Sequence, residues 1–283
     1  MGTLFLVATP IGNLEDITLR ALRILAEVPL IAAEDTRTIR KLLTHHQIRR
    51  PRLLSYTERS RRTRTPTILS ALNEGDVALV SEAGMPGISD PGVHLVGAAV
   101  AANHLVVPLP GPSAVTAAIA ASGLPTRQFY YLGFLPRQAG RRRRLLRDVA
   151  TRPETLIAFE SPHRLRDTLA DLHAELGDRQ LAVCRELTKL HEEIFRGALS
   201  AALDHFRQPR GEFTLVIEGC GTAKPKPQIP GSIDAELREM KARGRRAREA
   251  VREVAQRSGL PHREVYQRWL ALTRDGEAEG TVS

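Results

Sequence analysis

Residues 77–92 read VALVSEAGMPGISDPG, a run of four apolar residues followed by a loop rich in glycine and proline. Consecutive apolar residues indicate a strand that is buried on both faces of a sheet. Glycine lets a backbone approach a ligand closely, and proline fixes the shape of a loop without needing a hydrogen-bond partner. Because ligands bind beyond the carboxyl ends of strands in open α/β sheets, this stretch predicts both a strand and a ligand-binding loop.

Similar apolar runs recur through the first 220 residues and alternate with segments of helical periodicity. We predict strands at Leu4–Ala8, Leu30–Ala33, Val77–Ser81, Leu105–Pro108, Tyr130–Gly133, Leu156–Phe159, Leu181–Cys184 and Phe213–Glu218. We predict helices at Leu19–Leu25, with Thr18 as the N-cap, at Pro66–Leu72 and at Ala114–Ser122. Alternation of this kind favours an α/β fold with largely parallel sheets.

Two further loops follow predicted strands. Residues 9–18 read TPIGNLEDIT, and residues 109–113 read LPGPS. Three glycine- and proline-rich loops at strand ends predict one shared ligand cleft. The dinucleotide fingerprint GxGxxG and the phosphate-binding pattern GxxxxGK[ST] are absent from the sequence, which argues against an NAD enzyme, an ATPase and an ordinary Rossmann-type methyltransferase.

The chain is basic, with 41 Lys and Arg against 32 Asp and Glu in 283 residues. An excess of arginine favours a polyanionic partner such as RNA, because the planar guanidinium binds two phosphate oxygens at once. The alternative is a surface that is simply rich in arginine. The densest stretches are 49–64 and 137–147, and from them we predict RNA contacts at Arg61, Arg62, Arg141, Arg142, Arg143 and Arg144. In residues 233–273 opposite charges alternate at helical spacing, so a solvated helix face is the stronger interpretation there.

Cysteine and hydropathy patterns restrict the class of protein. Cys184 and Cys220 are the two cysteines, and neither lies near a histidine pair. This argues against a disulfide scaffold and a metal site and fits a reducing compartment, the cytoplasm. No apolar stretch approaches eighteen residues, so no membrane span is expected.

Composition shifts predict the organisation of the chain. We expect two α/β domains at 1–112 and 113–221, a proline-rich linker at 222–231 and a helical region at 232–273. Within that region we predict helices at Ile233–Arg257 and Arg263–Leu272, joined by a turn at Ser258–Pro261 in a helix-turn-helix-like arrangement. The last ten residues are expected to be frayed.

Seven ordered motifs stand out along the chain. They are TPIGNLEDIT (9–18), AEDTR (33–37), SEAGMPGISDPG (81–92), LPGPSA (109–114), GFLPR (133–137), ESPHRL (160–165) and RELTK (185–189) with EEIFRG (192–197). In this order they resemble the motifs of the ribosomal RNA small subunit methyltransferase I family, of the tetrapyrrole-methylase superfamily. The resemblance covers residues 1–221, and the C-terminal helices are also similar. One departure is Met85, where the family pattern leads us to expect threonine.

The resemblance implies two α/β domains with S-adenosylmethionine in the cleft between them, and a homodimer. We expect no metal, because no cluster of metal ligands is visible in the sequence. It implies 2′-O-methylation of a cytidine in the decoding region of 16S rRNA, and the dispersed basic residues favour the assembled small ribosomal subunit as the substrate. The cofactor-binding residues that it implies are Pro10, Gly84, Pro86, Ile88, Ser89, Asp90, Pro110, Gly111, Ser113, Ala114, Ser161 and Pro162.

The chemistry needs a positioned ribose hydroxyl and a group that assists loss of its proton. Our catalytic candidates are Lys189, Glu34 and Arg37. Lys189 could act as a cation that lowers the pKa of the hydroxyl or, if desolvated and neutral, as a base. Glu34 could also be a solvated loop residue. The same motifs contain Asp35, which could cap a helix, Glu186, and Glu160 and Arg185, which could form a structural ion pair.

Two alternative functions stay open at this point. The first is C-methylation of a tetrapyrrole, although such enzymes open with a loop resembling VxxGPGD and have no evident need of arginine clusters. The second is a non-catalytic RNA-binding assembly factor, against which the intact cofactor loops argue.

Overall fold

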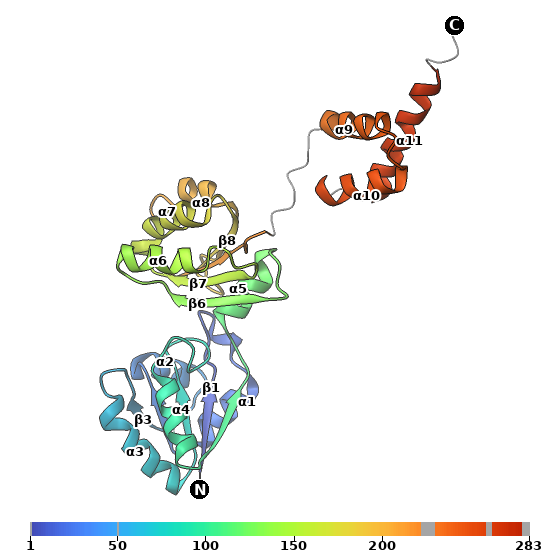
Figure 1. Cartoon of the computed structure of the whole chain (residues 1–283). Helices are drawn as coiled ribbons and strands as arrows, with labels where there is room; N and C mark the ends of the chain where they lie inside the picture. Colours follow the sequence, from blue (N-terminus) through green and yellow to red (C-terminus); the bar gives the residue numbers. More distant parts are fainter. Residues whose placement is uncertain (1, 50, 222–229, 259–261, 279–283) are drawn as a thin grey trace. The chain divides into compact units, whose positions relative to one another are not determined.

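The computed structural model describes residues 2–49, 51–221, 230–258 and 262–278, and it is shown in Figure 1. The chain forms two compact units, Met1–Cys220 and Gly221–Ser283. Among the described residues, no helix is long and apolar enough to cross a membrane.

The first sheet is parallel throughout and has the strand order β3-β2-β4-β1-β5. Its strands are β1 (Thr3–Val7), β2 (Leu30–Ala33), β3 (Arg52–Ser55), β4 (Val77–Val80) and β5 (Leu105–Leu109). The helices of this part are α1 (Leu19–Glu27), α2 (Thr36–His45), α3 (Arg61–Glu74) and α4 (Gly92–Ala101). All four residues of β4 are buried, and one hydrophobic cluster covers each face of the sheet. The strand predicted at Val77–Ser81 is therefore confirmed as a central strand, and it ends one residue earlier, at Val80.

The second sheet has the order β6-β7-β10-β8-β9 and is mixed. Its strands are β6 (Phe129–Phe134), β7 (Thr155–Glu160), β8 (Gln180–Arg185), β9 (Glu193–Ala198) and β10 (Phe213–Ile217). β6 and β7 are parallel, whereas β10 runs antiparallel to β7 and β8, and β8 is antiparallel to β9. The expectation of largely parallel sheets is thus wrong here. The reason is partly the short connection from β8 to β9, which closes a hairpin and leaves no room for a crossover helix.

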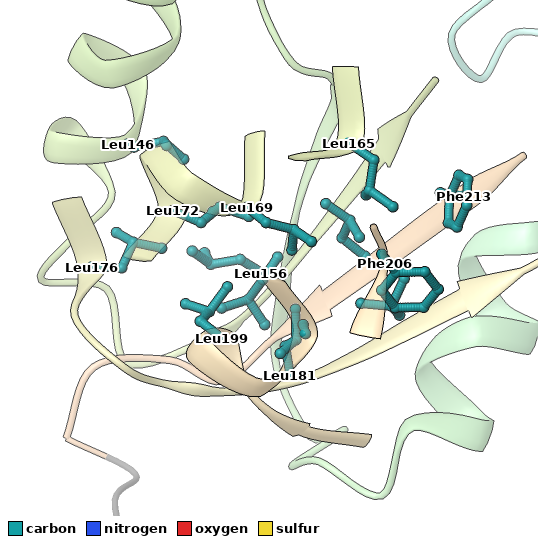
Figure 2. Packing of buried hydrophobic residues seen from close by; sticks show 14 of the residues in the cluster. Leu146, Leu156, Leu165, Leu169, Leu172, Leu176, Leu181, Leu199, Phe206 and Phe213 are labelled. Atoms are coloured by element: carbon teal, nitrogen blue, oxygen red, sulfur yellow. The ribbon is translucent and has the colours of Figure 1, made fainter. Parts of the chain in front are cut away.

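Two hydrophobic layers enclose the second sheet. Helices α6 (Ala139–Asp148), α7 (Leu165–Leu176) and α8 (Leu199–His205) cover one face, and Figure 2 shows leucines from these helices and from β7 and β8 meeting in one cluster. Helix α5 (Ala114–Ser122) packs on the other face through Val115, Ala118 and Ile119. The bounds of α5 agree with the prediction, and Gly123 ends the helix at φ +77°.

All eight predicted strands are confirmed, with ends within two residues of those expected. Thr18 caps α1 as predicted, accepting a hydrogen bond from Ala21 N at 3.1 Å. The predicted helix at Pro66–Leu72 lies within α3, which begins five residues earlier.

The C-terminal unit contains α9 (Pro230–Ala242), α10 (Ala247–Ser258) and α11 (His262–Ala278). They pack around a small core that includes Ile233, Leu237 and Val265. The single helix predicted at Ile233–Arg257 is wrong, because the chain breaks at Gly244, which has φ +73°. The helix α11 also continues past Arg274, where fraying was expected. Residues 222–229 of the predicted linker and 259–261 of the predicted turn lie outside the described residues.

Candidate active site

The three glycine- and proline-rich loops lie together at one edge of the first sheet. They follow β1, β4 and β5, which are neighbours in the sheet. Thr9 and Gly84 join the first two loops by a pair of backbone hydrogen bonds, with N–O distances of 3.0 and 2.9 Å. The three loops therefore share one edge of the sheet, but the cleft predicted there takes lining residues from the second and third loops and none from the first.

A pocket of about 470 Å³ lies at this edge, within the size range of small-molecule sites. Its lining residues are Met85, Ile88, Pro110, Gly111, Ser113, Val115, Thr116, Phe129 and Tyr131. Ile88, Pro110, Gly111 and Ser113 were predicted to bind cofactor. The other five were missed, and Phe129 and Tyr131 could not be found from loop patterns because they come from a strand of the second sheet.

Several other predicted cofactor residues shape the pocket without lining it. Ser89 has φ +65°, which is uncommon for a residue with a side chain, and its hydroxyl lies 2.7 Å from the hydroxyl of Tyr131. The Asp90 carboxylate accepts hydrogen bonds from Gly87 N (2.9 Å) and Gly92 N (2.7 Å). Gly84 has φ +79°. These contacts fix the 81–92 loop against both sheets.

Pro10, Pro86, Ala114, Ser161 and Pro162 do not line the pocket. Ala114 is the first residue of α5, and Ser161 precedes a short 3-10 helix that begins at Pro162. The part of the chain that the structure describes thus places the pocket wall at β6, not at the 160–165 motif.

Gly111 lies close to the chain at the end of β1. A β-carbon placed on it would lie 2.8 Å from the β-carbon of Ala8, just beyond β1. Glycine is required at this position by the packing of the protein itself, in addition to its place in the pocket wall.

The RELTK motif contacts the first loop, although the two are far apart in sequence. Asn13 N donates to Thr188 Oγ1 at 3.0 Å, and a β-carbon on Gly12 would lie 2.5 Å from Lys189 Cγ. Glu186 and Thr188 adopt positive φ angles of 49° and 68°. Such backbone strain in non-glycine residues is characteristic of functional sites.

Lys189 is held between two carboxylates. Its Nζ lies 2.9 Å from Glu186 Oε1 and 2.7 Å from Glu212 Oε2. Partial burial by itself would lower the pKa of Lys189, but the hydrogen bonds to Glu212 and Glu186 outweigh it and hold that pKa above its ordinary value. The side chain is a cation, which supports the cationic alternative over the neutral base.

Glu34 follows β2 at the same edge of the sheet. Burial and the nearby Asp90 carboxylate raise the pKa of Glu34 above its ordinary value. Asp35, by contrast, caps α2 as predicted by the alternative interpretation, accepting a hydrogen bond from Arg37 N at 2.7 Å. Hydrogen bonds from the Arg37 side chain and backbone lower the pKa of Asp35 to about 2. The Arg37 guanidinium is therefore paired, but exposed.

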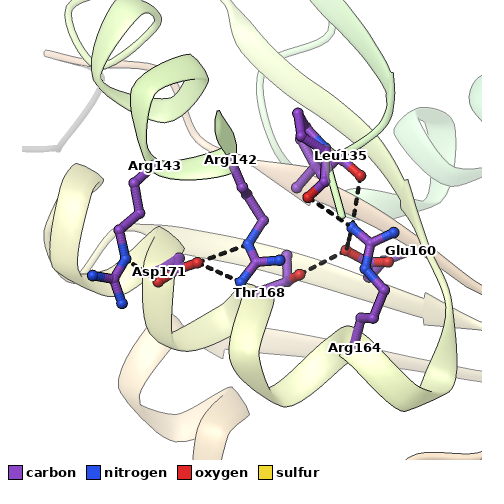
Figure 3. A network of polar contacts seen from close by, with 8 residues as sticks. Leu135, Arg142, Arg143, Glu160, Arg164, Thr168 and Asp171 are labelled. Carbon is purple, nitrogen blue, oxygen red and sulfur yellow. Dashed lines mark hydrogen bonds and ion pairs between the residues drawn. The ribbon is translucent and has the colours of Figure 1, made fainter. Parts of the chain in front are cut away.

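Glu160 and Arg185 do not form the ion pair that was considered. Buried Glu160 pairs with Arg164 at 3.1 Å and accepts a hydrogen bond from Thr168 Oγ1 at 2.6 Å (Figure 3). Arg185 pairs with Glu193 at 3.2 Å. Both residues have structural partners.

Comparison with known proteins identifies the family. The model of the Tetrapyrrole (Corrin/Porphyrin) Methylases matches residues 3–203. A ribosomal RNA small subunit methyltransferase I from Halalkalibacterium halodurans is 46% identical over 271 residues, which cover 94% of this chain and 93% of that protein. One from Synechocystis sp. is 47% identical over 281 residues, covering 98% of this chain and 100% of that protein. The chain belongs to the ribosomal RNA small subunit methyltransferase I family.

Solved structures agree with this fold. The methyltransferase CobJ superposes with a TM-score of 0.59 at 21% identity, covering 78% of this chain and 95% of that chain. A uroporphyrin-III C-methyltransferase from Thermus thermophilus, solved with S-adenosyl homocysteine, superposes with a TM-score of 0.54 at 20% identity. The match covers 77% of this chain and 97% of that chain. The α/β fold of the tetrapyrrole methylases, with small C-terminal helices, is confirmed.

In this member of the ribosomal RNA small subunit methyltransferase I family, the predicted RNA contact of Arg142 is wrong. The Arg142 side chain is 5% exposed, and it contacts Asp171 Oδ2 through two nitrogens, at 2.7 and 2.5 Å. Arg143 shares the same carboxylate at 2.6 Å (Figure 3). One buried acid thus pairs with two of the four adjacent arginines, and the sequence did not reveal this because Asp171 lies on α7, far along the chain.

The remaining predicted RNA contacts differ in their pairing. Arg61 pairs with Glu58 at 3.0 Å. Arg62, Arg141 and Arg144 are exposed, and within the described ranges they form no ion pair. Nor do the described residues contain a group of three His, Cys, Asp or Glu that could hold a metal.

Proposed function

We propose that this chain transfers a methyl group from S-adenosylmethionine to the 2′-oxygen of a cytidine ribose in the decoding region of 16S rRNA, acting on the assembled small ribosomal subunit. The observation that supports it most directly is the pocket that the loops after β4 and β5 build together with α5 and with β6 of the second sheet. It occurs in a chain whose relatives carry the name ribosomal RNA small subunit methyltransferase I. Because the proposed substrate is the small ribosomal subunit, we propose that the protein acts in the cytoplasm.

The pocket fits S-adenosylmethionine by its size and its chemistry. Phe129, Tyr131, Met85 and Ile88 provide apolar and aromatic surface for a purine, and Ser113 and the backbone at Gly111 provide polar atoms. Ser89, Asp90, Gly84 and Pro86 hold the 81–92 loop in shape. Of the predicted cofactor residues, Pro10, Ala114, Ser161 and Pro162 are the ones for which the pocket gives least support.

When bound, S-adenosylmethionine supplies a methyl group that is already activated by its sulfonium. The protein then has to place the ribose hydroxyl and accept its proton. Glu34 is the better base, because its raised pKa makes it a stronger proton acceptor than an ordinary carboxylate. Lys189 is a fixed cation beside the first loop, and its charge favours the deprotonated hydroxyl. Arg37 lies three residues from Glu34, and its exposed guanidinium suits a phosphate of the substrate.

Exposed apolar residues support a homodimer. Val93 and Val100 on α4 and Leu105 on β5, at the edge of the first sheet, are all exposed. A second copy of the chain would remove them from water. The boundary that we place between residues 112 and 113 is supported by α5, which begins at Ala114 and packs on the second sheet.

The deciding experiment maps methylation in rRNA. Small subunits from cells that lack the protein are incubated with it and with labelled S-adenosylmethionine, and a short oligonucleotide of the same local sequence serves as the comparison. The expected product is one ribose that resists alkaline cleavage, formed in the subunit alone. Label on a base or on a tetrapyrrole would contradict the proposed reaction, and efficient methylation of the oligonucleotide would contradict the extended substrate.

A further inference from the structure

Phe134 is an exposed aromatic residue that the fold holds at the edge of the candidate site. The side chain is 58% exposed, although phenylalanine is normally buried. It ends β6, the strand whose residues Phe129 and Tyr131 line the pocket, but it does not line the pocket itself. Because the ring lies beside the pocket and not in it, a ligand that contacts the ring differs from the one that fills the pocket.

A β-bulge turns Phe134 toward the side of the sheet where the pocket lies. In a regular strand, residues three apart point to opposite faces. The register of β6 shifts between Tyr131 and Gly133, so that Tyr131 pairs with Ile157 and Phe134 pairs with Phe159. Ile157 and Phe159 share one face, and Phe134 therefore joins Tyr131 on it. The rings of Phe134 and Tyr131 each lie 5.4 Å from that of Phe159.

The chain on both sides of Phe134 is fixed. Gly133 has φ +67°, and a β-carbon on it would lie 3.4 Å from Ser89 Oγ of the cofactor loop. After Phe134, the Leu135 side chain is buried, and the Leu135 carbonyl accepts a hydrogen bond from Arg164 Nη2 at 2.6 Å. Buried Glu160 pairs with the same guanidinium, as Figure 3 shows. A buried charge network thus holds an exposed ring in place, which reduces the entropy lost when a ligand packs on it.

The surroundings of Phe134 suit a nucleotide. Arg137 follows three residues later, and it is exposed and without an ion pair in the described part of the chain. An aromatic face with an unpaired guanidinium close in the chain matches a base and its phosphate. A protein interface formed by Phe134 would instead bring this charge close to an apolar contact.

We propose that Phe134 is the platform on which the base of the target nucleotide stacks while its ribose enters the candidate site. This inference rests on the proposed function and adds a residue that positions the substrate. It explains how a single nucleotide is held when most RNA contacts are to phosphates, which carry little sequence information.

The test compares Phe134→Leu and Phe134→Trp with a matched control, Tyr130→Leu. Tyr130 is on the same strand and 39% exposed, but it faces the other side of the sheet. With small ribosomal subunits as substrate, Phe134→Leu should lower kcat/KM by roughly 5- to 100-fold, the effect of losing one base–aromatic stack. Phe134→Trp should retain activity, and Tyr130→Leu should change it less than about twofold. Affinity for S-adenosylmethionine and the oligomeric state should be the same in all.

Subunits reconstituted with an abasic ribose at the mapped position give a sharper reading. Without a base to stack, wild type and Phe134→Leu should methylate at equal rates. Equal kcat/KM for the two proteins on intact subunits would overturn the proposal. Altered oligomeric state in Phe134→Leu would overturn it in favour of a protein interface, and weaker cofactor binding would assign Phe134 to the cofactor. Failure of the wild type to methylate subunits would instead contradict the proposed function.

Discussion

Ser89 Oγ and Tyr131 Oη lie 2.7 Å apart and join the 81–92 loop of the first sheet to β6 of the second. Ser89 has a left-handed backbone, and burial raises the pKa of Tyr131, so the phenol is neutral at physiological pH. The hydrogen bond joins the loop that carries Met85 and Ile88 to the strand that carries Phe129 and Tyr131. It therefore ties together two segments that line the proposed cofactor site.

Removing this hydrogen bond should weaken cofactor binding. Tyr131→Phe keeps the ring in the pocket wall and loses about 1 kcal/mol of hydrogen-bond energy, so we expect S-adenosylmethionine to bind about fivefold more weakly by calorimetry. Ser89→Gly loses the same bond while suiting φ +65°. The double variant should bind no more weakly than either single one, and additive losses would show that the two hydroxyls act independently.

A substitution at Ala8 should compensate for a substitution at Gly111. Gly111→Ala places a β-carbon 2.8 Å from that of Ala8, which forces the ends of β1 and β5 apart. We expect a loss of stability of about 1–3 kcal/mol in urea unfolding, together with weaker cofactor binding. Adding Ala8→Gly should restore both. Persistent loss of cofactor affinity in a restored fold would show that the Gly111 substitution acts on the ligand directly.

Arg142 and Arg141 should separate stability from RNA binding. Arg142→Gln leaves Asp171 buried without its main partner and should destabilise the protein by about 3–5 kcal/mol. Arg141→Gln should leave stability unchanged and lower the slope of log affinity against log salt, for binding to small subunits, by about 0.7–0.9. If neither Arg141→Gln nor Arg144→Gln changes this slope, both residues are solvated surface residues that do not contact RNA phosphates.

The raised pKa of Glu34 should affect how both thermal stability and the methylation rate depend on pH. Its pKa is raised above the ordinary 4.5, so the folded protein binds the proton more tightly than the unfolded chain. The stabilising effect of protonated Glu34 is full below pH 4.5 and is lost as the pH rises through the folded pKa. Glu34→Gln should therefore raise Tm relative to wild type at pH 7 but not at pH 4, and it should remove the acid limb of the methylation rate. An acid limb that survives the substitution would exclude Glu34 as the base.

Local signals predicted part of this structure well. The β4 strand and its loop, the capped start of α1 and the whole of α5 depend on neighbouring residues, and each lies where the sequence placed it. β9 reads EIFRGA and mixes polar with apolar residues, so it gave no signal. β3 has four residues, too few for a clear period.

The missed parts of the site depend on distant partners. Tyr131 reaches the pocket from the second sheet, and the burial of Arg142 depends on Asp171, 29 residues away. The charge of Lys189 depends on Glu212, 23 residues away. The spacing of motifs along the sequence does not predict these long-range contacts. The family motifs did predict where the loops lie.

The bond between Asn13 and Thr188 spans 175 residues. Closing so long a loop is entropically costly and cannot occur until both sheets have formed. A ribosome-bound nascent chain that ends before residue 188 can build the first sheet, yet it lacks Thr188 and Lys189, which contact the first loop. In a denaturation experiment the same contact should separate before the strands on either side of it melt. Methyl transfer then becomes a measure of how the two sheets dock, and it would disappear in mild urea while the circular dichroism of the helices is still intact.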